Sequence, residues 1–188
     1  YKKFMNDMLR KGKIRYPGFS FHDNAEVFRE ILNDFDWKLA QVQMNVLDEF
    51  NQATLDGIKL AEKKGVGIVI MEPLRGGMLA KNPPKNVAEA YAKLGGNRTH
   101  IDWCFRWLYD QPGAKVILSG MSNEAQLKDN INIFANTSAN CLTDSERAGL
   151  TEVRKAYESR VRVGCTGCRY CADCPREVHI DRIFRELD

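Results

Sequence analysis

The chain has 188 residues, 44% of them hydrophobic and 28% charged, which is ordinary for one folded domain with a small appendage. A net charge of +3 is too small to indicate a nucleic-acid or membrane-surface protein, and no apolar run approaches the ~20 residues of a membrane span. Six cysteines without a secretory signal favour metal ligation in a reducing compartment, so we expect a cytoplasmic protein. Tyr1 lies inside a helical pattern, and we therefore expect the chain to be the later part of a longer protein.

Strand and helix patterns alternate four times along the chain. Asn24 is a candidate N-cap, Ser122 is another, and Thr143 with Glu146 has the spacing of a capping box. Pro17 argues mildly against the first strand because proline donates no ladder hydrogen bond. In chain order we predict helix 1–12, strand 14–20, helix 24–35, strand 39–45, helix 50–64, strand 67–71, a loop with a short helix over 82–98, helix 99–111, strand 115–120, helix 123–135 and helix 144–159.

This alternation is typical of βαβ units around a parallel sheet, so the predicted fold class is α/β. Four such units can form an open doubly wound sheet or the second half of an eight-stranded TIM barrel. Polar or flexible residues follow each predicted strand, which favours a site at the rim where parallel strands end. These strand ends read Ser20-Phe21-His22, Gln43-Met44-Asn45, Met71-Glu72-Pro73 and Ser119-Gly120-Met121.

A run of four cysteines near the end of the chain carries the strongest chemical signal. The spacing in Cys165, Cys168, Cys171 and Cys174, followed by Pro175, lets four soft thiolates surround one metal centre, and it favours a single 4Fe–4S cluster. A structural zinc site remains an alternative, although zinc knuckles usually lie further apart. Disulfides would close strained small loops. A last amphipathic helix follows the run, so we divide the chain into residues 1–160 and a Cys-rich segment over 161–188.

Four ordered segments resemble the strand ends in the second half of an aldo/keto reductase barrel. They are similar to the fifth to eighth strand motifs of that family, and the resemblance covers about residues 1–160. The appended cysteine run matches a branch of the family that ends in a ferredoxin-like iron–sulfur segment. The four segments are 12–20, 41–45, 71–77 and 119–130.

The resemblance implies a nicotinamide coenzyme, NADP(H) or NAD(H), bound without a Rossmann motif, and the chain has no G-x-G-x-x-G after a strand. Glycines let backbone N–H groups approach a phosphate, and a thioether can pack on a nicotinamide ring where many relatives carry an aromatic residue. Taken alone, these residues also fit loop caps, a flexible loop and an exposed helix face. From the carboxamide to the adenine, the implied binding residues are Ser20, Gln41, Met71, Leu74, Gly76, Gly120, Met121, Ser122, Gln126 and Asn130.

The same resemblance places the catalytic tetrad, an Asp, a Tyr, a Lys and a His, on the family's first four strands. We therefore expect no catalytic residue in this chain. Here His22 fits a structural role, and Glu72 fits a surface salt bridge.

Two open sheet edges would remain in a half barrel, so we expect the first barrel half, from the same or another chain, as a partner. The leading hypothesis is an oxidoreductase that transfers hydride between NAD(P)H and a carbonyl or alcohol substrate and carries one iron–sulfur cluster. An electron-transfer partner would fit a redox-active cluster; nucleic acid and membrane partners are not expected. The alternative is a non-catalytic half-barrel fragment or metal-binding module with a structural iron–sulfur or zinc site.

Overall fold

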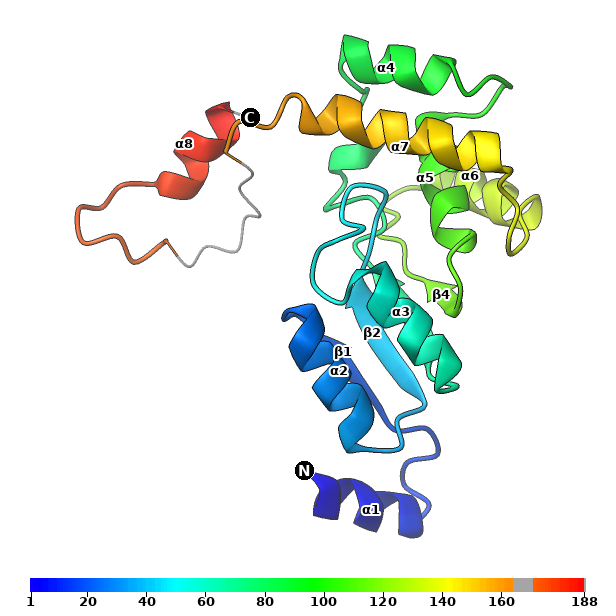
Figure 1. Cartoon of the computed structure of the whole chain (residues 1–188), viewed down its shortest axis with the longest axis vertical. Coiled ribbons are helices and arrows are strands. Elements are labelled where there is room, and N and C mark those ends of the chain that lie inside the picture. The colour runs from blue at the N-terminus through cyan, green and yellow to red at the C-terminus, as the bar shows by residue number, and fades with distance from the viewer. Residues whose placement is uncertain (164–170, 188) are drawn as a thin grey trace.

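The fold is built on a parallel β-sheet whose strands lie side by side in chain order, β1-β2-β3-β4 (Figure 1). The structure is a computed structural model and describes residues 1–163 and 171–187. Parallel neighbours need long crossovers, which the intervening helices supply. The elements are α1 (Lys2–Arg10), β1 (Gly18–Phe21), α2 (Ala25–Asp34), β2 (Leu39–Gln43), α3 (Thr54–Lys63), β3 (Gly67–Met71), the 3₁₀ turn η1 (Met78–Ala80), α4 (Lys85–Ala92), α5 (His100–Tyr109), β4 (Ala114–Ile117), α6 (Glu124–Ala135), α7 (Asp144–Glu158) and α8 (Ile180–Leu187).

The predicted strands exist, but three of them are shorter than their apolar patterns. β3 matches the predicted range 67–71. β1 begins only at Gly18, because Pro17 has no N–H to give to a ladder, although its carbonyl still accepts from Lys38 N at 2.8 Å. β4 ends at Ile117, and the backbone N–H of Leu118 continues the pairing with one bond of 2.9 Å to the carbonyl of Ile70.

Two of the predicted helix caps are confirmed and one is wrong. The Asn24 side chain accepts two backbone N–H bonds at the start of α2, and Thr143 with Glu146 forms the capping box of α7. Helix α6 is capped by Asn123 rather than Ser122. Asparagine can accept from the helix at this position as well as serine, and the Ser122 hydroxyl is instead directed to Gln126.

The capping box predicts a pH-dependent contribution to stability. Backbone N–H donation from Thr143 (2.8 Å), together with the Arg98 guanidinium, holds the pKa of Glu146 below its ordinary value. A carboxyl with a lowered folded-state pKa contributes stability above its unfolded pKa of about 4.3, and loses it as the pH falls through the folded value. Because the carboxylate is partly exposed, we expect Glu146→Gln to lower the unfolding free energy at pH 7 by only about 0.5–1 kcal/mol.

Thermal unfolding of both proteins between pH 7 and pH 3 checks this expectation. The difference in stability between wild type and Glu146→Gln should disappear as the pH falls toward 3. A gap that stays constant with pH would show that the charge of Glu146 does not matter.

One face of the sheet packs against helices and forms the core. Side chains alternate along the strands, so that Phe21, Val42, Ile68 and Ile70 are buried together on this face. Phe28 of α2 is fully buried and lies 4.9 Å from Phe21 between ring centroids. Helices α2 and α3 lie beside each other over this part of the sheet (Figure 1).

The contact between α2 and α3 depends on a glycine. A Cβ added to Gly57 of α3 would lie 2.8 Å from Cδ1 of the Phe28 ring. Alanine is the better helix former by about 1 kcal/mol, but forcing a methyl group against a packed ring costs about 1–3 kcal/mol. We therefore expect Gly57→Ala to lower the melting temperature by several degrees, against the trend of helix propensity.

Gly149→Ala in α7 is the matched control. The added Cβ there would meet mainly the far end of the half-buried Leu94 side chain, which can rotate away. Differential scanning calorimetry should show Gly149→Ala at or above the stability of the wild type. Equal effects of the two variants would refute the packing argument at Gly57.

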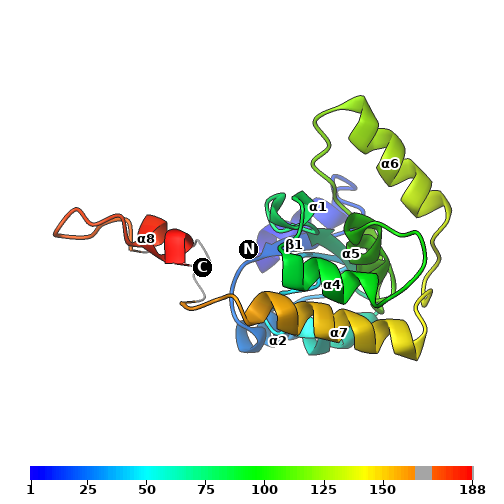
Figure 2. The same ribbon diagram turned by 90° about the horizontal axis from the view of Figure 1, so that it is seen from above.

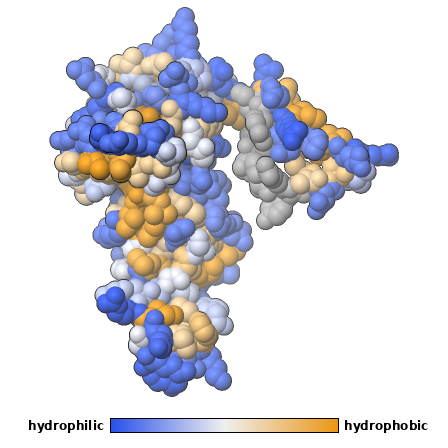
Figure 3. All heavy atoms as spheres, turned by 180° about the vertical axis from the view of Figure 1, so that it is seen from behind, coloured by the Kyte–Doolittle hydropathy of each residue, from blue (hydrophilic) through white to orange (hydrophobic). Residues whose placement is uncertain are grey.

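The other face of the sheet is open. The register places Ser20, Gln41, Val69 and Val116 in one row across the four strands, and these side chains are half-buried or exposed, with Val116 47% exposed. On the side of the molecule turned away from α2 and α3, apolar atoms reach the surface of the main body (Figure 3). Parallel sheets are covered on both faces in doubly wound folds and in TIM barrels alike, so an open face is unusual for a sheet of this kind.

Helices α4 and α7 form a second layer, and α8 forms a separate tail (Figure 1). Helix α7 packs along α4 and also contacts α5. Helix α8 stands away from the main body in both ribbon views (Figures 1 and 2). Within the described residues, no helix is both long and apolar enough to cross a membrane.

Candidate functional site

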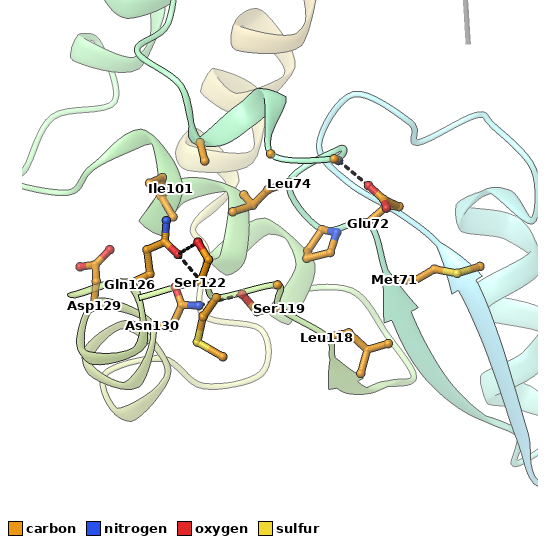
Figure 4. A pocket seen from close by; sticks show the side chains of 16 residues that line it. Met71, Glu72, Leu74, Ile101, Leu118, Ser119, Ser122, Gln126, Asp129 and Asn130 are labelled. Atoms are coloured by element: carbon orange, nitrogen blue, oxygen red, sulfur yellow. Dashed lines mark hydrogen bonds between the residues drawn. The ribbon is translucent and has the colours of Figure 1, made fainter. Parts of the chain in front are cut away.

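A pocket of about 730 Å³ opens beyond the carboxyl ends of β3 and β4 (Figure 4). One wall is the loop that leads from β3 into η1, and the opposite wall is the segment that leads from β4 into α6. This volume lies within the range of small-molecule and cofactor sites. Its lining residues are Met71, Glu72, Pro73, Leu74, Gly76, Gly77, Ala80, Ile101, Leu118, Ser119, Gly120, Met121, Ser122, Gln126, Asp129 and Asn130.

The loop after β3 has an unusual backbone. Glu72, Arg75, Gly76 and Gly77 all have positive φ angles, with 60° at Gly76 and 84° at Gly77. Such turns direct successive N–H groups toward one side, where they can bind an anion. The Glu72 carboxylate accepts the backbone N–H of Gly76 (Figure 4). Glu72 therefore forms a hydrogen bond within its own loop, in place of the surface salt bridge expected from the sequence.

A buried amide fixes the position of this loop. Asn45, which follows β2, donates to the Asp48 carboxylate at 2.7 Å and to the backbone carbonyl of Glu72 at 3.3 Å. The side-chain carbonyl of Asn45 accepts the backbone N–H of Leu47 at 3.0 Å. Asn45 is fully buried, and its paired polar atoms join the segment after β2 to the pocket wall.

Hydrogen bonds also order the α6 wall. Asn130 donates to the Ser119 hydroxyl at 2.8 Å, and the Gln126 side-chain carbonyl accepts both the N–H (2.8 Å) and the hydroxyl (3.2 Å) of Ser122 (Figure 4). The segment after β4 is therefore tied to the first two turns of α6. Its N–H groups lie at a helix N-terminus, which favours anionic groups.

The structure brings most of the predicted coenzyme residues together. Ser20 and Gln41 do not line the pocket, but Gln41 donates to the Met71 sulfur at 3.5 Å, and Ser20 is its register neighbour on β1. They extend the site along the open face of the sheet from its Met71 end. The predicted residues that line the pocket are Met71, Leu74, Gly76, Gly120, Met121, Ser122, Gln126 and Asn130.

Several lining residues were not singled out from the sequence as binding residues. Asp129 lies on the same helix as Gln126 at i+3, so helical spacing alone could have placed it beside the predicted pair. The sequence predicts Ser119 only as part of a strand end. Ile101 belongs to α5, and it reaches the pocket through tertiary packing that local pattern does not predict.

The predicted metal ligands are only partly described. Cys171 and Cys174 lie in a turn before α8, where both are half-buried and neither forms a disulfide. Cys165 and Cys168 fall outside the described residues. Among residues 1–163 and 171–187, no group of three or more His, Cys, Asp or Glu side chains could hold a metal ion. The donor set of closely spaced free thiols nevertheless suits iron or zinc.

One fully buried cysteine, Cys104, lies beside two tyrosines in the core. Cys104 of α5 is fully buried with its sulfur 3.4 Å from the Tyr91 hydroxyl, and burial raises the pKa of this thiol to about 11. Burial also raises the pKa of Tyr91, and it raises that of Tyr157 to about 12. All three groups stay protonated at neutral pH, so Cys104 is a core residue, as the sequence indicated.

Residues 2–154 match the model of the aldo/keto reductase family. The chain therefore belongs to that family. No curated protein matches the chain.

Solved structures support the fold. The chain is similar to the holo form of the aldo-keto reductase AKR11C1 from Bacillus halodurans, with 21% identity, 82% of this chain and 55% of that chain covered, and a TM-score of 0.67. It is also similar to the thermostable aldo-keto reductase Tm1743 in complex with the inhibitor epalrestat (19%, 82% and 53% covered, TM-score 0.62). A third similar structure is an aldo-keto reductase from Klebsiella pneumoniae in complex with NADPH. It has 16% identity and a TM-score of 0.58, with 81% of this chain and 52% of that chain covered. The chain spans about half the length of these proteins.

Proposed function

We propose that this chain is the coenzyme-binding half of a TIM-barrel oxidoreductase, which transfers hydride between a nicotinamide coenzyme and a carbonyl or alcohol substrate. The observation that carries the proposal is the pocket itself, because residues predicted from two distant segments, 71–77 and 119–130, form its opposite walls. The Klebsiella pneumoniae relative that binds NADPH supports the same ligand class. The bound coenzyme would supply the hydride.

The residues of the pocket have separate tasks in this proposal. The positive-φ loop at Gly76 and Gly77 brings the backbone close to the pyrophosphate. The Gly76 N–H would bind it in place of the Glu72 carboxylate that it contacts here, whereas the Gly77 N–H donates to the carbonyl of Leu74 at 3.0 Å. Gln126 and Asn130 hold the adenosine end. Met71 packs near the nicotinamide, with its sulfur already held by the Gln41 amide at 3.5 Å.

We further propose that four additional strands, from the same or another chain, complete the barrel over the open face of the sheet. Leu39, Val116 and Leu118 are each about 40–50% exposed on or beside this face, where they would otherwise remain in water. Both β1 and β4 are edge strands, and barrel closure removes such edges. The catalytic acid and its partners would lie on these additional strands, and the substrate would enter between the two halves.

The terminal segment is proposed to hold one 4Fe–4S cluster through Cys165, Cys168, Cys171 and Cys174. The ligand spacing and the free state of Cys171 and Cys174 support this assignment. A single-electron partner would fit a redox-active cluster, and a zinc ion would make the segment purely structural. Thiol-ligated iron also fits the reducing conditions of a cytoplasmic protein.

A combined binding and turnover assay tests the proposal. The complete protein, with both barrel halves present, should bind NADH or NADPH saturably, with a change in coenzyme fluorescence, and should oxidise it in the presence of aldehydes or ketones. Binding without turnover of any carbonyl would favour the non-catalytic alternative. Binding of neither coenzyme would overturn the proposed function.

A further inference from the structure

One buried carboxylate, that of Asp48, contacts the loop after β3 without lining the pocket. Asp48 lies in the segment between β2 and α3 and is only 6% exposed. Its Oδ2 accepts from the side-chain amides of Gln43 at 3.1 Å and Asn45 at 2.7 Å, and Nε of Arg75 lies 3.7 Å from the same oxygen. Because a buried charge needs donors that replace its hydration, this carboxylate is the centre of an ordered polar cluster.

The Asp48 carboxylate also fixes which way the Asn45 amide points. An ionised carboxylate can only accept hydrogen bonds and a backbone N–H can only donate, so the NH2 group of Asn45 faces Asp48 and its carbonyl faces Leu47. The same NH2 group also donates to the backbone carbonyl of Glu72 at 3.3 Å. Asp48 therefore orients the hydrogen bond by which the segment after β2 holds the pocket wall.

The two residues of the loop that this cluster reaches have a strained backbone. Glu72 has a φ of 56° and Arg75 a φ of 49°, a region that residues other than glycine rarely adopt. Such a conformation persists only where surrounding contacts hold it in place. Asn45 holds the carbonyl of Glu72. Asp48 holds the side chain of Arg75, so the cluster anchors the loop at two points.

We infer that Asp48 is a positioning residue for coenzyme binding, which holds residues 72–77 in the conformation that brings their backbone close to the pyrophosphate. The inference rests on the proposed function and adds to it a residue that lines no part of the pocket. A loop that is already held in its binding conformation loses less conformational entropy when the ligand binds. Weaker contacts at Asp48 should therefore loosen the loop and, as a consequence, lower coenzyme affinity.

Asp48→Asn in the complete protein, with both barrel halves present, tests this inference through two readouts. The amide keeps the size of the side chain but removes its charge, and hydrogen bonds to a charged acceptor are roughly twice as strong as those to a neutral one. Without coenzyme, hydrogen–deuterium exchange of residues 72–77 should become at least ~5-fold faster, while residues 118–130 in the opposite wall keep their rates. The dissociation constant of NADH or NADPH, whichever binds the wild type more tightly, should rise ~10-fold.

Asp110→Asn is the matched control. Asp110 is also buried, at 8% exposed, and accepts from Arg147 at 2.7 Å, but its partners lie in α7 and in the segment before α7. This variant should lower the melting temperature to a similar degree and leave both loop exchange and coenzyme affinity unchanged. Arg75→Gln, which removes one of the two anchors, should show a smaller change of the same kind as Asp48→Asn.

The outcomes separate the inference from the proposed function. Wild-type exchange of residues 72–77 in Asp48→Asn would overturn the positioning role, and so would faster exchange with unaltered coenzyme affinity. Equal losses of affinity in Asp48→Asn and Asp110→Asn would also overturn it, because they would reflect a general loss of stability. If Asp48→Asn does not fold, wild-type exchange and affinity in Arg75→Gln would overturn the role. A wild type that binds neither coenzyme would overturn the proposed function, while the exchange rates would still show whether Asp48 holds the loop.

Discussion

Replacing Gly120 by phenylalanine is expected to abolish nicotinamide-coenzyme binding while leaving the fold intact. A Cβ built on Gly120 meets no heavy atom within 4 Å, and the backbone there is outside the left-handed region, so a side chain adds no strain. Yet Gly120 lines the pocket, in the wall that leads from β4 into α6. A benzyl group would fill space that the coenzyme needs, and we expect at least a ~100-fold loss of affinity, equivalent to ~2.7 kcal/mol.

The matched control for this variant is Ala135→Phe. Ala135 is exposed at the end of α6, and it does not line the pocket. Isothermal titration calorimetry should find coenzyme affinity unchanged in Ala135→Phe and undetectable in Gly120→Phe, with both proteins melting within ~2 °C of the wild type. A Gly120→Phe protein that melts normally and still binds the coenzyme would place the site elsewhere.

Under the proposed 4Fe–4S assignment, replacing Cys171 by serine is expected to remove most of the iron. A serine oxygen is a harder and poorer ligand for an iron–sulfur cluster than a thiolate. Because a cluster needs all of its ligands, removing one of the four cysteines should remove nearly all of the iron and not only a quarter of it. We expect the brown colour and the iron and acid-labile sulfide content to fall together, with coenzyme affinity unaltered.

Cys141→Ser serves as the control for the cysteine chemistry. The Cys141 sulfur is half-buried and lies 3.8 Å from the carbonyl of Arg106, a contact that a serine hydroxyl can keep. Elemental analysis of this variant should match the wild type. A wild-type protein that is colourless and contains zinc would instead establish the structural-zinc alternative, and iron retained in Cys171→Ser would contradict the ligand assignment.

The sequence was most informative where local patterns and tertiary structure agree. The apolar run 67–71 lies between Gly65, which ends α3, and the loop that begins at Glu72, so both ends of β3 could be predicted. The capping box at Thr143 depends only on neighbours in sequence, and it was predicted for the same reason. The late start of β1 follows from Pro17, which has no N–H to donate to the ladder.

Contacts between distant segments could not be predicted in this way. Nothing local shows that Asn45 donates to the backbone of Glu72, or that Ile101 of α5 reaches the pocket. The Glu72 carboxylate could be placed near the site but not on the N–H of Gly76, because that bond depends on the positive-φ turn between them. The family resemblance predicted residues on both walls of the pocket. It did not predict that the carboxylate of Asp129 lines the same pocket as Glu72.

The two faces of the sheet show the same contrast between what local sequence predicts and what depends on distant segments. Periodicity predicts that Ile68 and Ile70 share a face, and both are fully buried. A parallel strand as uniformly apolar as β3 is usually covered on both faces, yet Val69 and Met71 remain half-buried. Their cover is supplied, in our proposal, by strands outside this chain's sheet.

Hydrogen–deuterium exchange with and without NADH tests the central claim most directly. Saturating NADH should slow amide exchange in two separated segments, residues 72–80 and 118–130, because these form the opposite walls of the pocket. The outer helices α2 and α7, whose residues do not line the pocket, should exchange at unchanged rates. Protection that spares both walls, or that falls mainly on α2 and α7, would contradict the assignment of this pocket to the coenzyme.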